Sequence, residues 1–480
     1  MSGGFLLALD LGTTSVRAII FDATGRAHSR AFSPLAVTYP LPGRVEQDAA
    51  DMWDRSVDVM RRAIADAGVS ASDIAGIGIA TQRAAAVAWD ARTMSPIAPV
   101  LGWQDVRTAE RVAAFRAIGI PLTTLAAVTK FEWWMQHDDA VRDASDGGTL
   151  RLGTPDTWLT ANLTGGGAHV TDPGNAASTA LFDNASGQWS APIAELFSVP
   201  AGALPLVVAT NAIVGETPSS LLGAPVPVAA RAGDQQAAMF GQGAHTPGDA
   251  TMTLGTSAIM DLHTGEGARE APTGAYALPL WDLTGSARTY CLEGTVITAG
   301  SAVDWLVDLG LARDPADASA AAAGVAASDG VAFVPALQGL GTPFADDTAR
   351  AAFYGLTRGS TRQHLARAVL EGIAHRCVDV GEALDLRDAA LRVGGGLARS
   401  DVLLQMIADY SGRDVLRAAE VEASALGAAF LAGIATGVFT GPEQCRQLLA
   451  APQRFGPAID PAMRVAARDR WASAIERTRC

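Results

Sequence analysis

Lysine is nearly absent from this sequence of 480 residues, in which Lys130 is the single occurrence. A phosphate-binding loop of the Walker type needs a lysine directly before Ser or Thr in a glycine-rich turn. Lys130 instead lies in the segment Val-Thr-Lys-Phe. The sequence therefore excludes this common route to nucleotide binding, and a nucleotide site would have to be built in another way.

Cysteine and histidine are also sparse. The 7 histidines form no HExxH pair, and the 4 cysteines, Cys291, Cys377, Cys445 and Cys480, have no CxxC spacing. Disulfide frameworks and transition-metal sites depend on such spacings. We therefore expect reduced thiols and no transition-metal site.

Long apolar runs and an excess of positive charge are missing as well. No apolar stretch reaches the roughly 20 uninterrupted residues that a membrane-spanning helix requires. The first residues, Met-Ser-Gly-Gly, lack the basic region of a secretion signal. A net charge of −14 disfavours binding to phosphate backbones and anionic lipids. We expect a cytoplasmic protein that binds neither nucleic acid nor membranes.

The composition is that of a folded protein, with 49% hydrophobic and 18% charged residues. A chain of this length exceeds the size of one ordinary hydrophobic core, so two or three domains are expected.

The first half of the chain alternates strand and helix patterns. Apolar runs at 5–10 and 16–21 flank the turn Gly12-Thr13-Thr14-Ser15, which predicts a hairpin. Residues 49–67 have helical spacing, with Met52, Met60 and Ile64 on one face. Further segments of this half are predicted as strands at 74–80, 85–89 and 225–232 and as a helix at 235–241.

A similar pattern restarts near residue 244. Strand-like runs at 250–254 and 258–262 flank Gly255-Thr256-Ser257, as in the first hairpin. The remaining predicted elements are helices at 297–311, 361–385, 400–410, 423–437 and 466–479 and a strand at 390–393. We therefore expect two related α/β halves, residues 1–243 and 244–480. The boundary between them lies at a cluster of Gly and Pro.

The hairpin turns could bind phosphates. Glycine lets backbone N–H groups approach an anion, and Thr hydroxyls add donors. Asp10, at the end of the first strand, could bind Mg²⁺ through water, because this ion prefers few carboxylates together with water and phosphate ligands. Ordinary hairpin turns beside a solvated Asp remain the alternative.

Asp234 lies where a predicted strand meets a predicted helix. A carboxylate there could accept the proton of a hydroxyl in phosphoryl transfer, or it could simply cap the helix. Arg83 could bind substrate hydroxyls or be a surface charge. Trp103 could stack on a ligand or pack in the core. Gly394-Gly395-Gly396 could lie against a nucleoside or form a flexible turn.

At these residues the sequence resembles the FGGY family of carbohydrate kinases, and within it the glycerol kinase-like members. The resemblance spans roughly residues 5–435, and its longest pattern runs from Ala351 to Glu371. The other matching segments are Leu9–Ala18, Gly43–Asp48, Thr81–Arg83, Trp103–Asp105, Gly153–Leu159, Gly233–Gln236, Glu293–Gly294 and Ala425–Ala429.

The resemblance implies two ribonuclease-H-like domains of the actin, sugar kinase and chaperone ATPase type around a central ATP cleft. The first would bind the sugar or polyol and carry one phosphate loop, and the second would bind ATP. Asp234 would be the general base, and Asp10 would bind Mg²⁺ through water. Arg83, Trp103 and Gln235 would join Asp234 in binding the substrate. The nucleotide would contact Thr13, Thr14, Ser15, Arg17, Gly255, Thr256, Gly300, Gly394, Gly395 and Gly396.

Some positions depart from the family pattern. Ala84 stands where glycerol kinases have a Glu that contacts substrate, Leu125 stands in place of a Tyr, and Ile259 in place of a Phe. Each lost hydrogen bond to a neutral group is worth about 1 kcal/mol, so discrimination among hydroxylated ligands changes. The expected reaction is ATP-dependent phosphorylation of a hydroxyl of a small polyol or sugar. A ketose such as xylulose, another modified sugar, or a non-catalytic role as a ligand sensor are the alternatives, and a homodimer is compatible with each.

Overall fold

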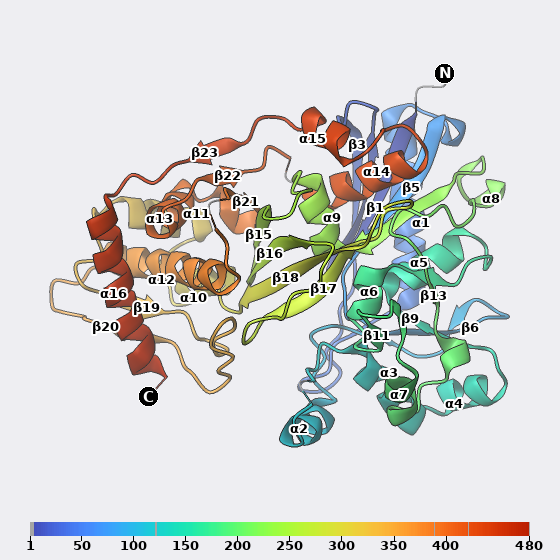
Figure 1. The fold of residues 1–480 in the computed structure, drawn as a ribbon, viewed down its shortest axis with the longest axis horizontal. Coiled ribbons are helices and arrows are strands. Elements are labelled where there is room, and N and C mark those ends of the chain that lie inside the picture. Colours follow the sequence, from blue (N-terminus) through green and yellow to red (C-terminus); the bar gives the residue numbers. More distant parts are fainter. Residues whose placement is uncertain (1–3, 121, 388, 421, 480) are drawn as a thin grey trace. The chain divides into compact units, whose positions relative to one another are not determined.

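The computed structural model describes residues 4–120, 122–387, 389–420 and 422–479 (Figure 1). The chain divides into two compact units. Unit 1 contains residues up to Gly243 together with Pro279–Thr289 and Glu422–Leu449. Unit 2 contains Ala244–Leu278, Tyr290–Val421 and Ala450–Cys480. Two segments that the sequence places in the second half, 279–289 and 422–449, thus pack with the first.

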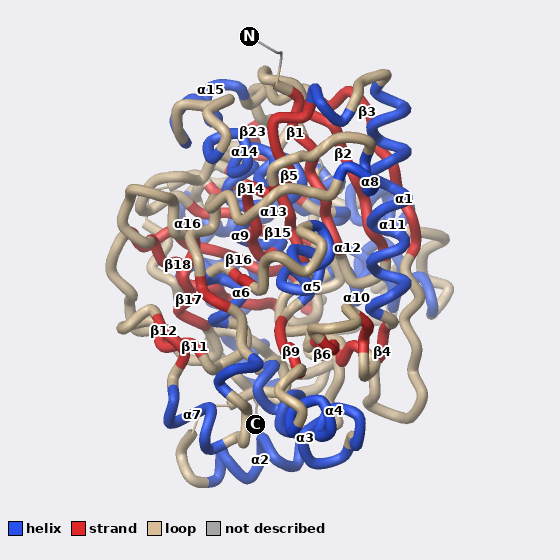
Figure 2. Tube along the Cα trace, turned by 90° about the vertical axis from the view of Figure 1, so that its right-hand side faces the viewer, coloured by secondary structure: helices blue, strands red, loops and turns tan. Residues whose placement is uncertain are grey.

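The main sheet of unit 1 has five strands in the order β14-β5-β1-β2-β3. These are β1 (Phe5–Leu11), β2 (Ser15–Phe21), β3 (Ala27–Pro34), β5 (Ile74–Thr81) and β14 (Val228–Gly233). Strands β1, β2 and β3 pair with one another in antiparallel fashion, whereas β5 is parallel to both β1 and β14. Figure 2 shows β1, β2, β5 and β14 side by side.

The faces of this sheet follow from the alternation of side chains along β1. Leu7, Leu9 and Leu11 belong to the same buried cluster as Met52 and Met60 of helix α1 (Ala49–Ala67). Helix α1 has the bounds that the sequence predicts. It begins after Asp48, whose side chain accepts the N–H of Ala50, and it ends at Gly68 in a left-handed conformation.

Helix α14 (Ala423–Ala435) contacts β1, β5, β14 and helix α9 (Asp234–Gly241). Glycine makes this close approach possible. A Cβ added at Gly427 would lie 1.8 Å from the Ala237 carbonyl oxygen, and one at Gly78 would lie 2.0 Å from that of Ala428. The Gly-Ala composition of α14 therefore sets how closely it packs on the sheet.

Shorter elements complete unit 1. The strands are β4 (Glu46–Gln47), β6 (Val87–Asp90), β7 (Ser95–Pro96), β8 (Val100–Leu101), β9 (Leu150–Gly153), β10 (Val170–Thr171), β11 (Phe182–Asp183), β12 (Gln188–Trp189) and β13 (Leu206–Val207). The helices are α2 (Ala109–Ala117), α3 (Ala127–His137), α4 (Asp139–Asp146), α5 (Pro155–Leu163), α6 (Pro173–Ala177), α7 (Ala191–Leu196), α8 (Ser219–Leu222) and α15 (Pro442–Leu448).

The main sheet of unit 2 has the order β17-β18-β16-β15-β21-β22-β23. Its strands are β15 (Ala250–Leu254), β16 (Ala258–Gly265), β17 (Tyr276–Trp281), β18 (Thr289–Val296), β21 (Leu391–Gly394), β22 (Val415–Arg417) and β23 (Gln453–Phe455). Strands β18, β16 and β15 are antiparallel neighbours, and β21 is parallel to β15 and β22. This repeats the order of β3, β2, β1, β5 and β14, so the predicted duplication of an α/β unit is confirmed.

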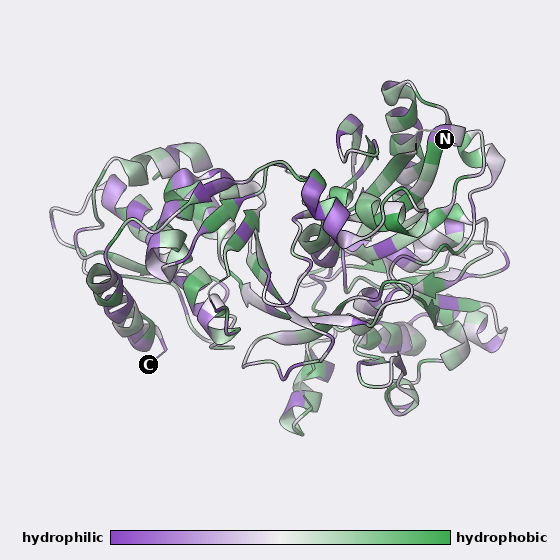
Figure 3. Ribbon diagram, turned by 45° about the horizontal axis from the view of Figure 1, so that its top comes forward, coloured by the Kyte–Doolittle hydropathy of each residue, from purple (hydrophilic) through white to green (hydrophobic). Residues whose placement is uncertain are grey.

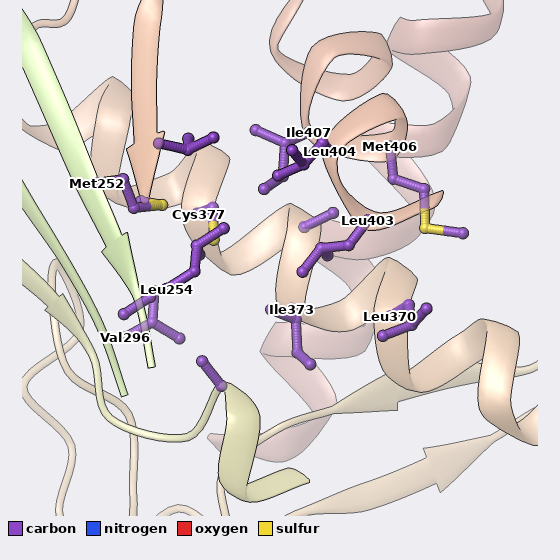
Figure 4. Close-up of a cluster of buried hydrophobic side chains, with 14 of the residues drawn as sticks. Met252, Leu254, Val296, Leu370, Ile373, Cys377, Leu403, Leu404, Met406 and Ile407 are labelled. Carbon is purple, nitrogen blue, oxygen red and sulfur yellow. The ribbon is translucent and has the colours of Figure 1, made fainter. Parts of the chain in front are cut away.

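The core of unit 2 lies between this sheet and its helices (Figure 4). The helices are α10 (Gly300–Asp308), α11 (Pro315–Ala323), α12 (Arg362–Ala383), α13 (Asp401–Ser411) and α16 (Pro461–Thr478), and a small sheet joins β19 (Ala332–Val334) to β20 (Ala352–Tyr354). In Figure 4, Met252 and Leu254 of β15 lie near Ile373 and Cys377 of α12.

Helix α16 is held against α12 by stacked rings. His375 lies between Tyr410 and Trp471, with ring centroids 4.1 Å and 5.1 Å away. The helix begins at Pro461, earlier than predicted, because the Asp460 side chain caps it by accepting the N–H of Met463. Figure 3 shows hydrophobic and hydrophilic residues on this helix, as its contact on one side requires.

No helix within the described part of the chain is long and apolar enough to cross a membrane. Cys291, Cys377 and Cys445 are buried, and Cys480 lies outside the described residues.

Candidate functional site

The carboxyl ends of three parallel strands meet at one edge of the unit 1 sheet. Leu11 of β1 pairs with Thr81 of β5, and Thr81 pairs with Gly233 of β14. Asp10, Arg83 and Asp234 therefore emerge beside one another. In α/β sheets this edge is where ligands characteristically bind.

A cross-strand pair anchors the first hairpin. Asp10 lies directly opposite Arg17 in the register of β1 and β2, and Arg17 Nε lies 3.9 Å from Asp10 Oδ2. The Arg17 Nη1 group donates a 2.5 Å hydrogen bond to Glu422 Oε2 at the start of α14. The guanidinium is thus shared by two carboxylates of unit 1.

Burial raises the pKa of Asp10 to about 7. The positive charge of Arg17 lowers it, while the negative charges of Asp234 and Glu422 raise it further. A carboxyl group with a pKa in this range changes its charge readily near neutral pH. A pKa shifted by burial and by named charges at a sheet edge is typical of a functional site.

The turn between β1 and β2 is held from two sides. Its Gly12 N–H donates to the Ser15 carbonyl oxygen over 2.9 Å. Gln47 Nε2 donates to the Thr13 carbonyl oxygen over 2.7 Å, and Trp103 Nε1 donates to Thr13 Oγ1 over 2.9 Å. Thr14 is exposed at the tip, while Ser15 is buried and its hydroxyl accepts from Arg17.

Arg83 and Asp234 lie close together, with 3.9 Å between Arg83 Nε and Asp234 Oδ1. Gly233 makes room for this arrangement, since a Cβ there would lie 2.5 Å from Arg83 Cδ and 2.5 Å from Gln236 Oε1. The Gln235 N–H donates to Asp234 Oδ1 over 2.8 Å. Asp234 begins helix α9 and is preceded by Gly233 at the N-cap, so it is not the cap residue itself.

Unit 2 has an equivalent turn beside a cavity of about 780 Å³. The Gly255 N–H donates to the Ser257 carbonyl oxygen, matching Gly12 and Ser15. Gly300 packs on this turn, because its Cβ would lie 2.5 Å from the Gly255 carbonyl oxygen. The cavity is lined by Gly255, Thr256, Gly300, Val303, Asp304, Asp314, Pro315, Ala316, Ser319, Ala320, Ala323, Gly396, Leu397, Arg399, Ser400, Asp401 and Val402.

The three consecutive glycines of unit 2, 394–396, occupy different positions. Gly394 ends strand β21, and Gly395 has a φ of +92°, a conformation that favours glycine. A Cβ at Gly395 would also lie 2.5 Å from the Leu254 carbonyl oxygen. Of the three, Gly396 lines the cavity.

The structure therefore groups the expected site residues by unit. Unit 1 gathers Asp10, Thr13, Thr14, Ser15, Arg17, Arg83, Trp103, Asp234 and Gln235 around one sheet edge. Unit 2 gathers Gly255, Thr256, Gly300, Gly394, Gly395 and Gly396 around the equivalent edge.

Sequence reasoning missed some residues of this site. Glu422 binds Arg17 across 405 positions of sequence, and the buried side chains of Gln47 and Gln82 link the first turn to the segment that carries Arg83. The sequence held one indication for Glu422. It directly precedes a predicted helix, where Glu is not a favoured N-cap residue, and in the structure its side chain does not cap α14.

The positions that depart from the family pattern lie in both units. Ala84 is buried and adopts a left-handed backbone with a φ of +62°. Leu125 is partly exposed, before helix α3. Ile259 lies on β16 of unit 2.

The groups present around Asp10 fit a magnesium ion held mainly by other ligands. Within the described residues, no cluster of three or more His, Cys, Asp or Glu side chains could hold a metal ion. Magnesium commonly binds through one or two carboxylates, with water and phosphate oxygens as its other ligands. Asp10 meets this requirement as one buried carboxylate beside a turn rich in hydrogen-bond donors.

Comparison with known proteins shows the family of the chain. Residues 5–241 match the model of the FGGY family of carbohydrate kinases, N-terminal domain, and residues 250–436 match that of the C-terminal domain. A glycerol kinase of Bordetella parapertussis is 40% identical, over 98% of this chain and 96% of its own. Glycerol kinase 2 of Thermotoga maritima is 37% identical, over 99% of this chain and 98% of its own.

Solved structures of carbohydrate kinases are also similar to this chain. The Plasmodium falciparum glycerol kinase with ADP has a TM-score of 0.93 at 27% identity, covering 99% of this chain and 98% of its own. A xylulose kinase from Rhodospirillum rubrum has a TM-score of 0.85 at 28% identity, with the same coverage of 99% and 98%. With both family models matched along most of its length, the chain belongs to the FGGY family of carbohydrate kinases.

Proposed function

We propose that this protein transfers the γ-phosphoryl group of ATP to a hydroxyl of a small polyol or sugar. The observation that carries the proposal is the meeting of Asp10, Arg83 and Asp234 at the carboxyl ends of three parallel strands. Phosphoryl transfer needs positioned donors, charge neutralisation and a proton acceptor, and this edge supplies each type of group.

Asp234 is the proposed general base. Its carboxylate takes the proton of the acceptor hydroxyl while that oxygen forms a bond to the γ-phosphorus. The bond from the γ-phosphorus to the oxygen bridging it to the β-phosphate breaks, and ADP leaves. Arg83, 3.9 Å from Asp234, is placed to donate hydrogen bonds to the acceptor's hydroxyls. Gln235 and Trp103 belong to the same proposed acceptor site.

The first turn is the proposed site for the transferred phosphate. Thr13, Thr14 and Ser15 offer hydroxyl and backbone donors, and Arg17 offers positive charge. Asp10 would hold Mg²⁺ through water. When bound, this ion would neutralise phosphate charge in the transition state.

The cavity of unit 2 is the proposed site for the nucleoside. Its volume of about 780 Å³ lies within the usual range for small-molecule sites. Gly255 and Thr256 lie at its turn and are proposed phosphate contacts. Gly300 and the segment Gly394-Gly395-Gly396 would bring backbone close to the adenosine. The ADP in the Plasmodium falciparum relative supports a nucleotide in proteins of this fold.

Glycerol is the first acceptor to consider, because the curated relatives at 37–40% identity are glycerol kinases. A ketose such as xylulose is the second. Ala84 and Leu125 cannot supply the side-chain hydrogen bonds of Glu and Tyr, and xylulose kinases share the fold. These substitutions favour an acceptor with fewer polar demands at these two positions.

A coupled assay for ADP release tests the proposal. The purified protein is given MgATP and, one at a time, glycerol, other small polyols, xylulose and further ketoses and aldonates. We expect ADP release to require one acceptor class and its phosphorylated product to appear by mass spectrometry. Nucleotide binding without transfer to any acceptor would instead support a ligand sensor.

A further inference from the structure

The residue after Arg83 has an unusual backbone conformation. Ala84 has a φ of +62°, which residues with a side chain rarely adopt. Such a conformation persists only where surrounding contacts hold it, and strained residues of this kind cluster at functional sites. Ala84 is also buried, so its backbone polar groups need partners within the protein.

Two side chains from different helices provide those partners. Lys130 of α3 donates a 2.6 Å hydrogen bond from Nζ to the Ala84 carbonyl oxygen. The Ala84 N–H donates over 3.3 Å to Ser178 Oγ, at the end of α6. Ser178 Oγ in turn donates to the Asn175 carbonyl oxygen over 2.7 Å, which fixes the hydroxyl. Both sides of residue 84 are thus held from outside its own segment.

Lys130 is an unexpected residue for this place. It is the single lysine of the chain, and its side chain is fully buried. Burial lowers its pKa to about 7, with Asp105 raising the pKa and Arg107 lowering it further. A lysine kept inside at this cost in solvation needs a specific bond, and the bond that it makes is to Ala84.

We propose that Lys130 is a positioning residue, which holds Ala84 in the left-handed conformation and thereby directs Arg83 toward Asp234. Arg83 must lie across Gly233 to reach within 3.9 Å of Asp234, in space that a side chain at Gly233 would fill. The direction of the chain at residue 84 decides whether this path is taken. Lys130 thus acts on the acceptor through Arg83, and this inference rests on the proposed function.

Kinetics of a single and a double variant test the inference. Lys130→Met removes the donor but keeps most of the side-chain volume, and we expect the KM for the acceptor to rise about tenfold. The KM for ATP should stay within about twofold, since the bond lies on the acceptor side. In the double variant with Ala84→Gly the acceptor KM should return most of the way, because glycine adopts a positive φ without strain.

A matched control is Ser29→Ala. Ser29 Oγ donates to the Ala63 carbonyl oxygen over 2.6 Å, so a buried side-chain bond to the backbone is lost in the same unit, away from Arg83. Both KM values should be unchanged in this control. Equal changes in the two KM values of Lys130→Met, or no rescue by Ala84→Gly, would overturn the proposal. If Lys130→Met does not fold, Ser178→Ala replaces it with the same expected pattern.

Amide hydrogen exchange tests the inference in the absence of substrate. In Lys130→Met, or in Ser178→Ala if that variant replaces it, amide exchange of the segment 81–86 should be about tenfold faster, and it should slow again with Ala84→Gly. Unchanged exchange in this segment would overturn the positioning role. A wild-type protein that phosphorylates no acceptor would sink the proposed function instead, so the two failures can be told apart.

Discussion

Arg83 and Asp234 follow different strands, β5 and β14, yet Arg83 Nε lies 3.9 Å from Asp234 Oδ1. The parallel register of the two strands, in which Thr81 pairs with Gly233, brings them to the same edge. A cation that binds hydroxyls and a carboxylate that can accept a proton are thereby placed within reach of one small acceptor.

Replacing Asp234 with Asn should abolish most of the turnover. Asn is nearly isosteric but cannot accept the hydroxyl proton, so kcat should fall by roughly 100- to 10,000-fold. The affinity for ATP should be nearly unchanged, because the proposed nucleoside site lies in unit 2. Steady-state kinetics and calorimetric titration with ATP measure the two quantities. A kcat near that of the wild type would remove Asp234 from its proposed role.

Replacing Gly233 with Ala should displace Arg83. The new Cβ would lie 2.5 Å from both Arg83 Cδ and Gln236 Oε1, closer than side chains tolerate, so both side chains must shift. We expect the KM for the acceptor to rise by about tenfold or more, with a smaller change in the KM for ATP.

Gly202→Ala is the control for this variant. Gly202 lies in unit 1, and nothing lies within 4 Å of an added Cβ there. Its kinetics should match those of the wild type. If Gly233→Ala behaves like this control, the path of Arg83 across Gly233 is not needed for acceptor binding.

Local sequence signals predicted much of the fold. The hairpin turn at Gly12 was predicted from turn chemistry, and helix α1 from its apolar spacing, both of which act over a few residues. Strand β14 was predicted to begin at residue 225. It begins at Val228, because Pro225 and Pro227 lack the N–H that a sheet ladder needs.

Long-range pairing is what the sequence could not reveal. Trp103 was predicted to stack on a ligand or to pack in the core, and neither prediction includes the bond of its indole N–H to Thr13, 90 positions away. The partnership of Arg17 with Glu422 depends on where α14 packs, which no local pattern encodes. Strands β17 and β18 were also missed. Contacts of this kind arise from tertiary packing.

Filling the unit 2 cavity should weaken the binding of the nucleotide but not that of the acceptor. Ala320 of α11 lines the cavity and is exposed, so Ala320→Trp should occupy part of the proposed nucleoside site without disturbing the core. We expect the KM for ATP to rise about tenfold, with the KM for the acceptor nearly unchanged. Steady-state kinetics with each substrate varied in turn measure this.

Ala327→Trp provides the comparison. Ala327 is also exposed in unit 2 but does not line the cavity. It should leave the KM for ATP as in the wild type. Equal KM values for the two Trp variants would argue against a nucleoside in this cavity.

Replacing Asp379 with Asn should destabilise unit 2. Asp379 accepts hydrogen bonds from Arg376 over 2.7 Å, from Arg468 over 2.6 Å and from Trp471 over 3.0 Å. Arg376 is itself buried, and losing its counter-charge leaves an uncompensated cation. The free energy of unfolding should fall by about 3–5 kcal/mol, as measured by urea denaturation.

Asp58→Asn tests whether any lost ion pair has this effect. Asp58 pairs with Arg62 over 3.0 Å on the exposed surface of α1. Such pairs contribute about 0–1 kcal/mol, so the unfolding midpoint should barely move. A similar loss in both variants would mean that the buried network around Asp379 has no special weight.

Replacing Glu422 with Gln should shift the pH dependence of the reaction. Burial raises the pKa of Asp10 to about 7, and the negative charge of Glu422 raises it further, whereas Arg17 lowers it. If Asp10 acts in its ionised form, kcat/KM rises as the pH increases through that pKa. Without the charge of Glu422 the pKa of Asp10 falls, so the acidic limb should move to lower pH.

Profiles of kcat/KM against pH for the wild type and Glu422→Gln measure this shift. Glu443→Gln is the control, because Glu443 is an exposed residue of unit 1 on α15, and its loss should leave the profile in place. A limb that moved to higher pH would mean that loosening Arg17 outweighs the lost charge of Glu422. A limb that did not move would mean that Asp10 does not control the reaction in this range.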